Sequence, residues 1–229
     1  MLHGYAPALL NGSLLTLALA LASLALACLL GLAFAAARLS RSRALQALSL
    51  AYTTLIRGVP DLVLMLLVFF GGQLAVNALA QRIGHADYID VDPFIAGTLT
   101  IGFIFGAYLS ETFRGAFLAL PAGQREAALA CGLSRAQTLR RIELPQMLRH
   151  ALPALSNNWL VLVKSTAIVS VIGLNDMMLR ATQAAGATRE PFVFYAAAAL
   201  IYLAITSASE LGFKALQRKA SVGVRAGSL

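Results

Sequence analysis

Long apolar stretches separated by short polar segments occupy most of this 229-residue sequence. No Asp, Glu, Lys or Arg occurs between Met1 and Ala37, and 9–37 is long enough to cross a bilayer, because about 20 apolar residues in a helix span the hydrocarbon layer. Further stretches of spanning length cover 94–120, 151–174 and 193–216. An open strand cannot satisfy its backbone hydrogen bonds in lipid, so we predict that each of these stretches is a helix.

The apolar stretch from Leu45 to Leu79 is too long for one crossing. As a single helix it would be roughly 52 Å long, against about 30 Å of hydrocarbon. Proline removes a backbone donor and clashes with the preceding turn, so Gly58-Val59-Pro60 predicts a break. We therefore expect an early helical segment, a break, and a main span at about 55–79.

The composition excludes a water-soluble protein. Hydrophobic residues make up 59% of the chain and charged residues 12%, whereas a soluble domain carries roughly 25% charged residues. Too few polar side chains remain to cover a soluble globule, which excludes a soluble enzyme, a disordered chain and a secreted disulfide scaffold. The sequence therefore predicts an all-α membrane protein with five transmembrane helices in a single domain, 1–229.

The positive charges predict how the spans are oriented. Lys and Arg residues concentrate on the cytoplasmic side of membrane proteins. Most of the 18 Lys and Arg residues lie between spans one and two, between spans three and four, or after span five; those on the opposite side are Arg82, Arg180 and Arg189. We therefore expect the N-terminus outside and the C-terminus inside.

The sequence contains no familiar motif for catalysis or nucleotide binding. His3, His85 and His150 are isolated, and neither HExxH nor GxSxG occurs. The chain also lacks GxxxxGKS and GxxxxGKT, whose backbone amides would hold ATP phosphates. We expect no catalytic residue, no metal ligand and no cofactor in this chain, and no nucleic-acid partner.

The longest polar segment, 121–150, lies between spans three and four. Residues 126–130 favour a helix that Gly132 would end, as glycine commonly does at a helix C-terminus. Ser134 can cap a second short helix, which we expect to end at Pro145. From the residues alone, this segment could be a basic loop that lies on anionic lipid headgroups.

A sharper pattern occupies the same segment. It combines a Glu-Ala-Ala triplet, a glycine, and an isoleucine followed two residues later by Leu-Pro: Glu126, Ala127, Ala128, Gly132, Ile142, Leu144 and Pro145. This EAA–G–I-LP signature resembles that of the permease subunits of bacterial ABC importers. The resemblance implies a type I (MetI-like) permease fold and a coupling helix in this segment that fits a cleft on a separate cytoplasmic ATPase.

The residues of the segment suit that function. Ala127 and Ala128 permit close approach of a partner, and Arg135, Arg140 and Arg141 offer charge-assisted contacts to its acidic groups. A rigid helix pair fixed in two spans would pass a rigid-body motion into the membrane. The resemblance implies that ATP and Mg²⁺ are bound by the partner ATPase.

The resemblance covers essentially the whole chain and is closest to the polar amino-acid permeases. The matching residues are Asn11-Gly12, Thr16, Arg57-Gly58-Val59-Pro60, Glu111, Arg114-Gly115-Ala116, Pro121, Gly123, Asn157, Asn158, Lys164, Ser165 and Thr166. The stretches YTTLIRGVPDLVLMLL and ETFRGAF are similar to those of the Q-type permeases of histidine and lysine/arginine/ornithine uptake.

This resemblance implies a permease subunit that moves polar, basic amino acids across the bacterial inner membrane by alternating access. Its implied partners are two ATP-binding subunits, a second permease in an M-type heterodimer or a homodimer, a periplasmic amino-acid-binding protein and membrane lipid. The alternative is a stand-alone secondary transporter or channel, which would not need the EAA segment. A membrane enzyme is disfavoured because the sequence has no catalytic constellation.

Ionisable groups inside a membrane are costly, so each requires a function or a partner. Asp61 follows the predicted break, where freed backbone groups often line a substrate path. Its carboxylate could attract a cationic substrate, or it could pair with Arg57 or Lys164. Lys164 could hold a substrate carboxylate, or it could pair with Glu111 or Asp61.

Other polar residues in the spans carry similar alternatives. Asn157 and Asn158 could join helices or line the path, and with Arg57, Asp61 and Lys164 they complete the candidate substrate path. Residues one helical turn apart can pair, so we expect two structural ion pairs: Glu111 with Arg114, and Glu210 with Lys214.

Overall fold

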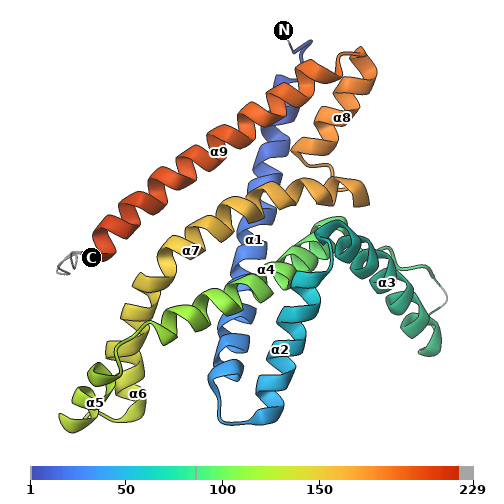
Figure 1. Cartoon of the computed structure of the whole chain (residues 1–229). Coiled ribbons are helices and arrows are strands. Elements are labelled where there is room, and N and C mark those ends of the chain that lie inside the picture. Colours follow the sequence, from blue (N-terminus) through green and yellow to red (C-terminus); the bar gives the residue numbers. More distant parts are fainter. Residues whose placement is uncertain (1, 86, 222–229) are drawn as a thin grey trace.

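The computed structural model describes residues 2–85 and 87–221. Figure 1 shows that the described chain consists of helices joined by short connections. In chain order they are α1 Ala6–Leu39, α2 Arg43–Gly58, α3 Asp61–Arg82, α4 Pro93–Leu118, α5 Ala122–Ala130, α6 Arg135–Thr138, the π-helix η1 Leu139–Glu143, α7 Leu144–Ser165, the 3₁₀-helix η2 Thr166–Ile172, α8 Met177–Thr188 and α9 Pro191–Ala220.

Within the described residues, five helical paths are long and apolar enough to cross a membrane. They are Ala6–Leu39, Asp61–Arg82, Pro93–Leu118, Arg135–Ile172 and Pro191–Ala220. The predicted helical class and number of spans are confirmed. The fourth path differs from the predicted 151–174, because its helix begins at Arg135.

The predicted break in the second apolar stretch is confirmed, and it falls between α2 and α3. Helix α2 ends at Gly58, and both Val59 and Pro60 have extended backbone conformations (ψ 138° and 136°). The second span therefore starts at Asp61, not near residue 55. Figure 1 shows α3 leaving this break at a steep angle to α2.

The core is built around the crossing of α1 and α4, which small side chains allow to pack closely. A Cβ atom added to Gly102 would lie 2.6 Å from Leu26 Cδ2, and one added to Gly31 would lie 2.7 Å from Leu109 Cβ. Small residues at such positions let helix backbones approach closely in membranes. The fully buried Leu19 and Leu109 lie in this core.

Helices α3 and α9 are the most exposed of the five apolar paths. Apolar side chains of α3 that are exposed in this chain include Leu62, Leu67, Phe70 and Leu74. The segment that follows α3 is tied back to it, because Asn77 Oδ1 accepts a 2.8 Å hydrogen bond from the Ile89 amide. An apolar helix exposed in this way suits contact with lipid or with another membrane subunit.

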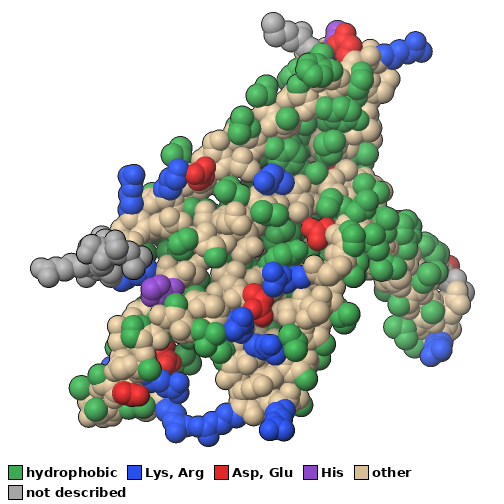
Figure 2. Space-filling view, in the orientation of Figure 1, with side chains coloured by type: hydrophobic (Ala, Val, Ile, Leu, Met, Phe, Trp, Pro, Cys, Tyr) green, Lys and Arg blue, Asp and Glu red, His purple; other side chains and the backbone are tan. Residues whose placement is uncertain are grey.

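Figure 2 shows where charged side chains gather on one face of the molecule. Many Lys and Arg side chains lie toward the end of the molecule that carries the α1–α2 connection and the α5–α6 segment, as a comparison with Figure 1 indicates. Green apolar side chains cover much of α3 and the opposite end.

Candidate functional site

The α5–α6 segment forms the two short helices predicted around Gly132. The Leu133 amide donates to the Ala128 carbonyl (3.1 Å) and the Gly132 amide donates to the Leu129 carbonyl (3.0 Å). Gly132 itself has φ +83°. This is the Schellman arrangement, in which a glycine in the left-handed region ends a helix. The predicted function of Gly132 as a helix terminator is confirmed.

Ser134 begins the next helix, as predicted. Its hydroxyl accepts from the Gln137 amide (3.3 Å), and Gln137 Oε1 accepts from the Ser134 amide (2.9 Å). Such a reciprocal capping box satisfies two amides that a helix start leaves without partners. The start of this helix could therefore be predicted from Ser134 and its near neighbour Gln137 alone.

The prediction that Pro145 ends this helix is wrong. The chain passes from α6 through the π-helix η1 into α7, and Pro145 lies in the first turn of α7. The Leu144 amide donates to the Leu139 carbonyl, five residues earlier. This wider turn accommodates a proline that would otherwise clash with the preceding turn. The α5–α6 segment is thus joined to the fourth span by one helical path.

Most signature residues of this segment lie at the surface of the chain. Glu126, Ala127, Gly132 and Pro145 are exposed, as is the neighbouring Arg135. Of the remaining signature residues, Ala128 is buried, and Ile142 and Leu144 are half-buried. The exposed residues are available to a partner.

An ion pair and a cavity connect the segment to the spans. Arg125 Nε lies 3.6 Å from Glu143 Oε1, which links α5 to η1. Beside this pair is a cavity of about 670 Å³, whose walls include Leu39 of α1, Phe117 of α4 and Met147 of α7. The segment therefore lies beside α1, α4 and α7.

The five candidate substrate-path residues do not form one cluster. Asn158 Nδ2 donates to Thr112 Oγ1 (3.0 Å) and so joins α7 to α4, whereas Asn157 and Lys164 are exposed. The Arg57 guanidinium lies 5.3 Å from the centre of the Tyr108 ring. Among the described residues, no ion pair involves Lys164, Arg57 or the half-buried Asp61.

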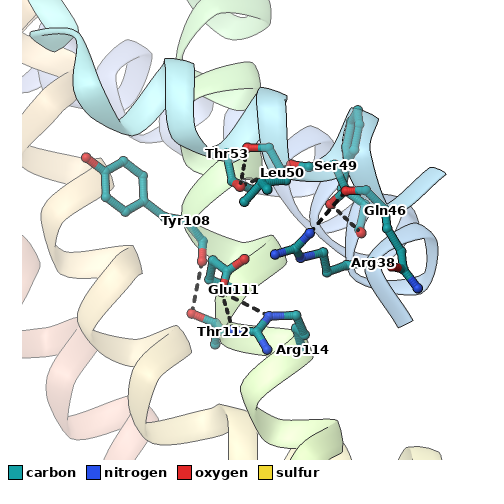
Figure 3. A network of polar contacts seen from close by, with 10 residues as sticks. Arg38, Gln46, Ser49, Leu50, Thr53, Tyr108, Glu111, Thr112 and Arg114 are labelled. Carbon is teal, nitrogen blue, oxygen red and sulfur yellow. Dashed lines mark hydrogen bonds and ion pairs between the residues drawn. The ribbon is translucent and has the colours of Figure 1, made fainter. Parts of the chain in front are cut away.

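Both predicted structural ion pairs are confirmed. Arg114 donates from Nε and Nη2 to Glu111 Oε2, at 3.0 and 2.6 Å, and Lys214 Nζ lies 2.7 Å from Glu210 Oε1. Figure 3 shows Glu111 and Arg114 on α4, with Arg38 of α1 pointing toward the same space. This space is a cleft of about 440 Å³ between the end of α1, α2 and α4, and it also contains Arg57.

Sequence reasoning missed Asp176, which is the buried residue before α8. One carboxylate oxygen, Oδ1, accepts from the Leu179 amide (2.9 Å), and the side chain is fully buried. Burial raises the pKa of the Asp176 carboxyl to about 6, although hydrogen bonds from amides of α8 and the charge of Arg180 lower it. The available signal was the aspartate itself, because an aspartate side chain can cap the start of a helix.

Histidine and acidic residues give no sign of a metal centre in residues 2–85 and 87–221: no group of three metal-ligating side chains gathers there. His3 is not isolated as predicted, because its Nε2 lies 3.1 Å from Glu190 Oε2. The start of α1 and the start of α9 meet there, so residues distant in sequence pair through the fold.

Residues 27–222 match the family model described as the inner membrane component of binding-protein-dependent transport systems. This chain belongs to that family. The residues of the EAA–G–I-LP signature run from α5 through η1 to the first turn of α7, and we call this stretch, 121–150, the coupling loop after the function that the signature implies. Family membership also accounts for the five apolar helical paths and gives the inner membrane as the location of the chain.

Curated relatives in the family match over all or nearly all of their lengths. The chain is 51% identical over 230 residues to the histidine/lysine/arginine/ornithine transport system permease protein HisQ of Salmonella typhimurium, covering 100% of both chains. It is 50% identical to HisQ of Escherichia coli K12, with the same coverage. It is 41% identical to the arginine ABC transporter permease protein ArtQ of Haemophilus influenzae, covering 95% of each chain.

Solved structures give the same fold for this permease. An amino acid ABC transporter crystallised with histidines matches with a TM-score of 0.79 at 30% identity, covering 94% of this chain and 95% of that one. An inward-facing methionine transporter, MetNI, matches with a TM-score of 0.72 at 17% identity, covering 93% and 95%. The MetI-like permease fold expected from the signature is therefore shown.

Proposed function

We propose that this permease is the membrane subunit of an ATP-driven importer that carries basic amino acids, of the histidine, lysine, arginine and ornithine class, into the cell. The observation that carries the proposal is the full-length 51% identity to a permease named for transport of those four amino acids. Relatives named for arginine, octopine and nopaline transport are also similar, at 38–41% identity.

The importer requires partners that bind and hydrolyse ATP and a partner that delivers the substrate. The chain has no phosphate-binding loop of its own, so two ATP-binding subunits would dock, one on the coupling loop of this chain and one on that of a second permease. A periplasmic binding protein would deliver the amino acid, as the family description implies. The exposed apolar face of α3 supports assembly with a second permease, as a heterodimer or a homodimer.

The geometry of the coupling loop supports its docking function. Its surface carries the exposed Arg135, Arg140 and Arg141, which make no ion pair within the described chain. Arginine side chains of this kind bind carboxylates through paired hydrogen bonds. Motion of a bound ATPase would reach the membrane through the continuous path from Arg135 to Ile172.

The proposed orientation places the N-terminus outside and the C-terminus inside. It rests on the excess of Lys and Arg around the coupling loop and the α1–α2 connection, which in membrane proteins marks the cytoplasmic side. This orientation brings the coupling loop to the cytoplasm, where ATP is available.

Reconstitution tests the proposed function. The assembled transporter in proteoliposomes, supplied with its binding protein and ATP, is expected to accumulate radiolabelled histidine, lysine, arginine and ornithine, and vanadate is expected to abolish the uptake. Glutamate and leucine serve as control substrates. Uptake that persists without the ATPase subunits would support a stand-alone transporter instead, and equal uptake of glutamate would contradict the basic substrate class.

A further inference from the structure

A cleft on the α1–α2–α4 face has the size and polarity of a small-molecule site. It is an open cleft of about 440 Å³, and its polar lining residues are Arg38, Thr53, Thr54, Arg57, Tyr108 and Glu111. Sites for small ligands commonly enclose about 300–1,000 Å³ and present a few convergent polar groups. The charged lining of this cleft sets it apart from the mainly apolar cavity beside the coupling loop.

The two guanidinium groups of the cleft retain free donors. Arg57 is exposed and lies over the Tyr108 ring, and none of the hydrogen bonds or ion pairs within the described residues involves its side chain. Arg38 donates one hydrogen bond, from Nη1 to the Gln46 carbonyl (3.2 Å). An arginine stacked on an aromatic ring keeps its planar edge available for a carboxylate. Two cations with free donors in one cleft therefore favour an oxyanion ligand.

Glu111 places an acidic oxygen in the same cleft. Both hydrogen bonds from Arg114 end on Oε2, and Oε1 has no hydrogen-bond partner within the described residues. In Figure 3 the Glu111 carboxylate and the Arg38 guanidinium point toward a common space beside α2. A carboxylate oxygen there repels a phosphate but accepts a hydrogen bond from an ammonium group. The cleft thus offers both signs of charge at separate positions.

We propose that this cleft binds the α-carboxylate and α-ammonium groups that all free amino acids share, with Arg57 and Arg38 contacting the carboxylate and Glu111 Oε1 contacting the ammonium. The inference rests on the proposed function. In the proposed orientation Arg38 lies in the last turn of α1, at its cytoplasmic end, so the cleft is a site on the release side. Binding the shared groups tolerates different side chains, which suits an importer of several amino acids.

Direct binding of radiolabelled L-arginine to the assembled transporter in nanodiscs, without the binding protein, tests the site. Arg57→Gln and Glu111→Gln are each expected to weaken binding at least tenfold. Arg43→Gln removes an exposed arginine at the start of α2, away from the cleft lining, and is expected to stay within twofold of wild type. If Arg57→Gln does not assemble, Arg57→Lys is expected to weaken binding about threefold, because it keeps the charge and loses the planar fork.

Ligand analogues distinguish recognition of the shared groups from a general charge effect. Agmatine, which is arginine without the α-carboxylate, is expected to compete at least tenfold more weakly than L-arginine against wild type. In Arg57→Gln that difference should shrink, because the group that reads the carboxylate is gone. An unchanged difference between the two ligands in this variant would overturn the proposed contact.

The outcomes separate the site from the function. If wild type imports amino acids but Arg57→Gln and Glu111→Gln bind arginine normally, or if wild type shows no direct binding, the site is wrong and the proposed function stands. If wild type imports none of the four amino acids, the proposed function is wrong. Arginine binding that is displaced by phosphatidylglycerol in the nanodisc would assign the cleft to a lipid phosphate and overturn the inference.

Discussion

Asp61 is the first residue of α3, directly after the break, and the structure leaves it half-buried with no ion pair among the described residues. The structural alternative, a pair with Arg57 or Lys164, therefore has no support in the described chain. At an effective dielectric near 20, opposite charges about 4 Å apart attract by about 4 kcal/mol before desolvation. Desolvation reduces the net effect to about 1–3 kcal/mol, as for hydrogen bonds to charged groups. We therefore expect Asp61→Asn to reduce uptake of lysine and arginine roughly tenfold, measured at matched protein level.

Histidine provides a control for this prediction, because the charge of its side chain changes with pH while the rest of the substrate stays the same. Its side chain has an ordinary pKa of about 6.5, so it is mostly cationic at pH 5.5 and mostly neutral at pH 8. Relative to wild type, Asp61→Asn should impair histidine uptake more at pH 5.5 than at pH 8. Equal losses at both pH values would show that Asp61 acts through structure and not through charge.

Asp176 makes a prediction about stability. Its pKa of about 6 in the folded state exceeds its ordinary value near 4, because burial disfavours the carboxylate. From roughly pH 4 to 6 the folded chain holds a proton that the unfolded chain has released, so stability falls as pH rises through this window. Asp176→Asn removes that loss, and it should raise the unfolding free energy at pH 8 by on the order of 1–3 kcal/mol and change it little at pH 4.

Thermal unfolding of the purified complex at pH 4 and pH 8 measures this difference. Asp92→Asn is the matched control, because Asp92 also caps a helix, with Oδ1 accepting from the Ile95 amide at 2.9 Å, but is exposed. A pH-dependent gain that is equal in the two variants would trace the effect to helix capping and not to burial.

The coupling loop shows what local sequence signals can and cannot predict. Gly132 and Ser134 act through their own backbone and nearest neighbours, so their functions could be predicted from the sequence. Pro145 could not be placed, because its tolerance depends on the hydrogen-bond register of the preceding turn, which no single residue signals. The break before α3 was predictable from local residues, because Gly58 and Pro60 both disfavour a continuing helix.

Gly132 carries the element-scale prediction. Its φ of +83° costs roughly 1–2 kcal/mol for most side chains, while an added Cβ would meet no atom within 4 Å. The effect of substitution is therefore on backbone conformation. We expect Gly132→Asp to abolish, and Gly132→Ala to weaken severalfold, co-purification of the ATPase subunits, with membrane insertion unchanged.

Gly123→Ala is the control for that experiment. Gly123 lies exposed within helix α5 of the same loop, and an added methyl group meets no atom within 4 Å there. Normal ATPase retention is expected in this variant. Normal retention in Gly132→Asp as well would contradict the docking function of the coupling loop.

The arrangement of the whole molecule sets a prediction about orientation. Cysteines introduced at Asp90 and Ala187 are expected to react with an impermeant maleimide from outside, whereas those at Ser134 and Ser221 are expected to react from inside only. The native Cys131 is exposed on the coupling loop, so the experiment uses a Cys131→Ser background. External labelling at Ser134 would reverse the orientation and exclude cytoplasmic docking.

Contacts between distant elements limited what could be predicted at this scale. The length of each apolar stretch was enough to locate the spans, because that length depends on the thickness of the bilayer and not on contacts with other helices. The bond from Asn158 to Thr112 and the cleft that joins Arg38 to Glu111 depend on how α1, α4 and α7 cross, which the pattern of one helix does not determine. For the same reason Lys164 could not be assigned a partner from the sequence.

The π-helix between α6 and α7 also has an angular consequence. A turn with five-residue hydrogen bonding holds about one residue more than an α-turn, and each residue of an α-helix rotates the chain by about 100°. The extra residue in Leu139–Glu143 therefore sets the angle at which the coupling loop projects from the axis of the fourth span. Deleting one residue there would leave the apolar span intact and swing the loop by about 100°. If the deleted residue is not Ile142, every signature residue stays in the chain, and the proposed docking would then present a different side of α5 to the ATPase.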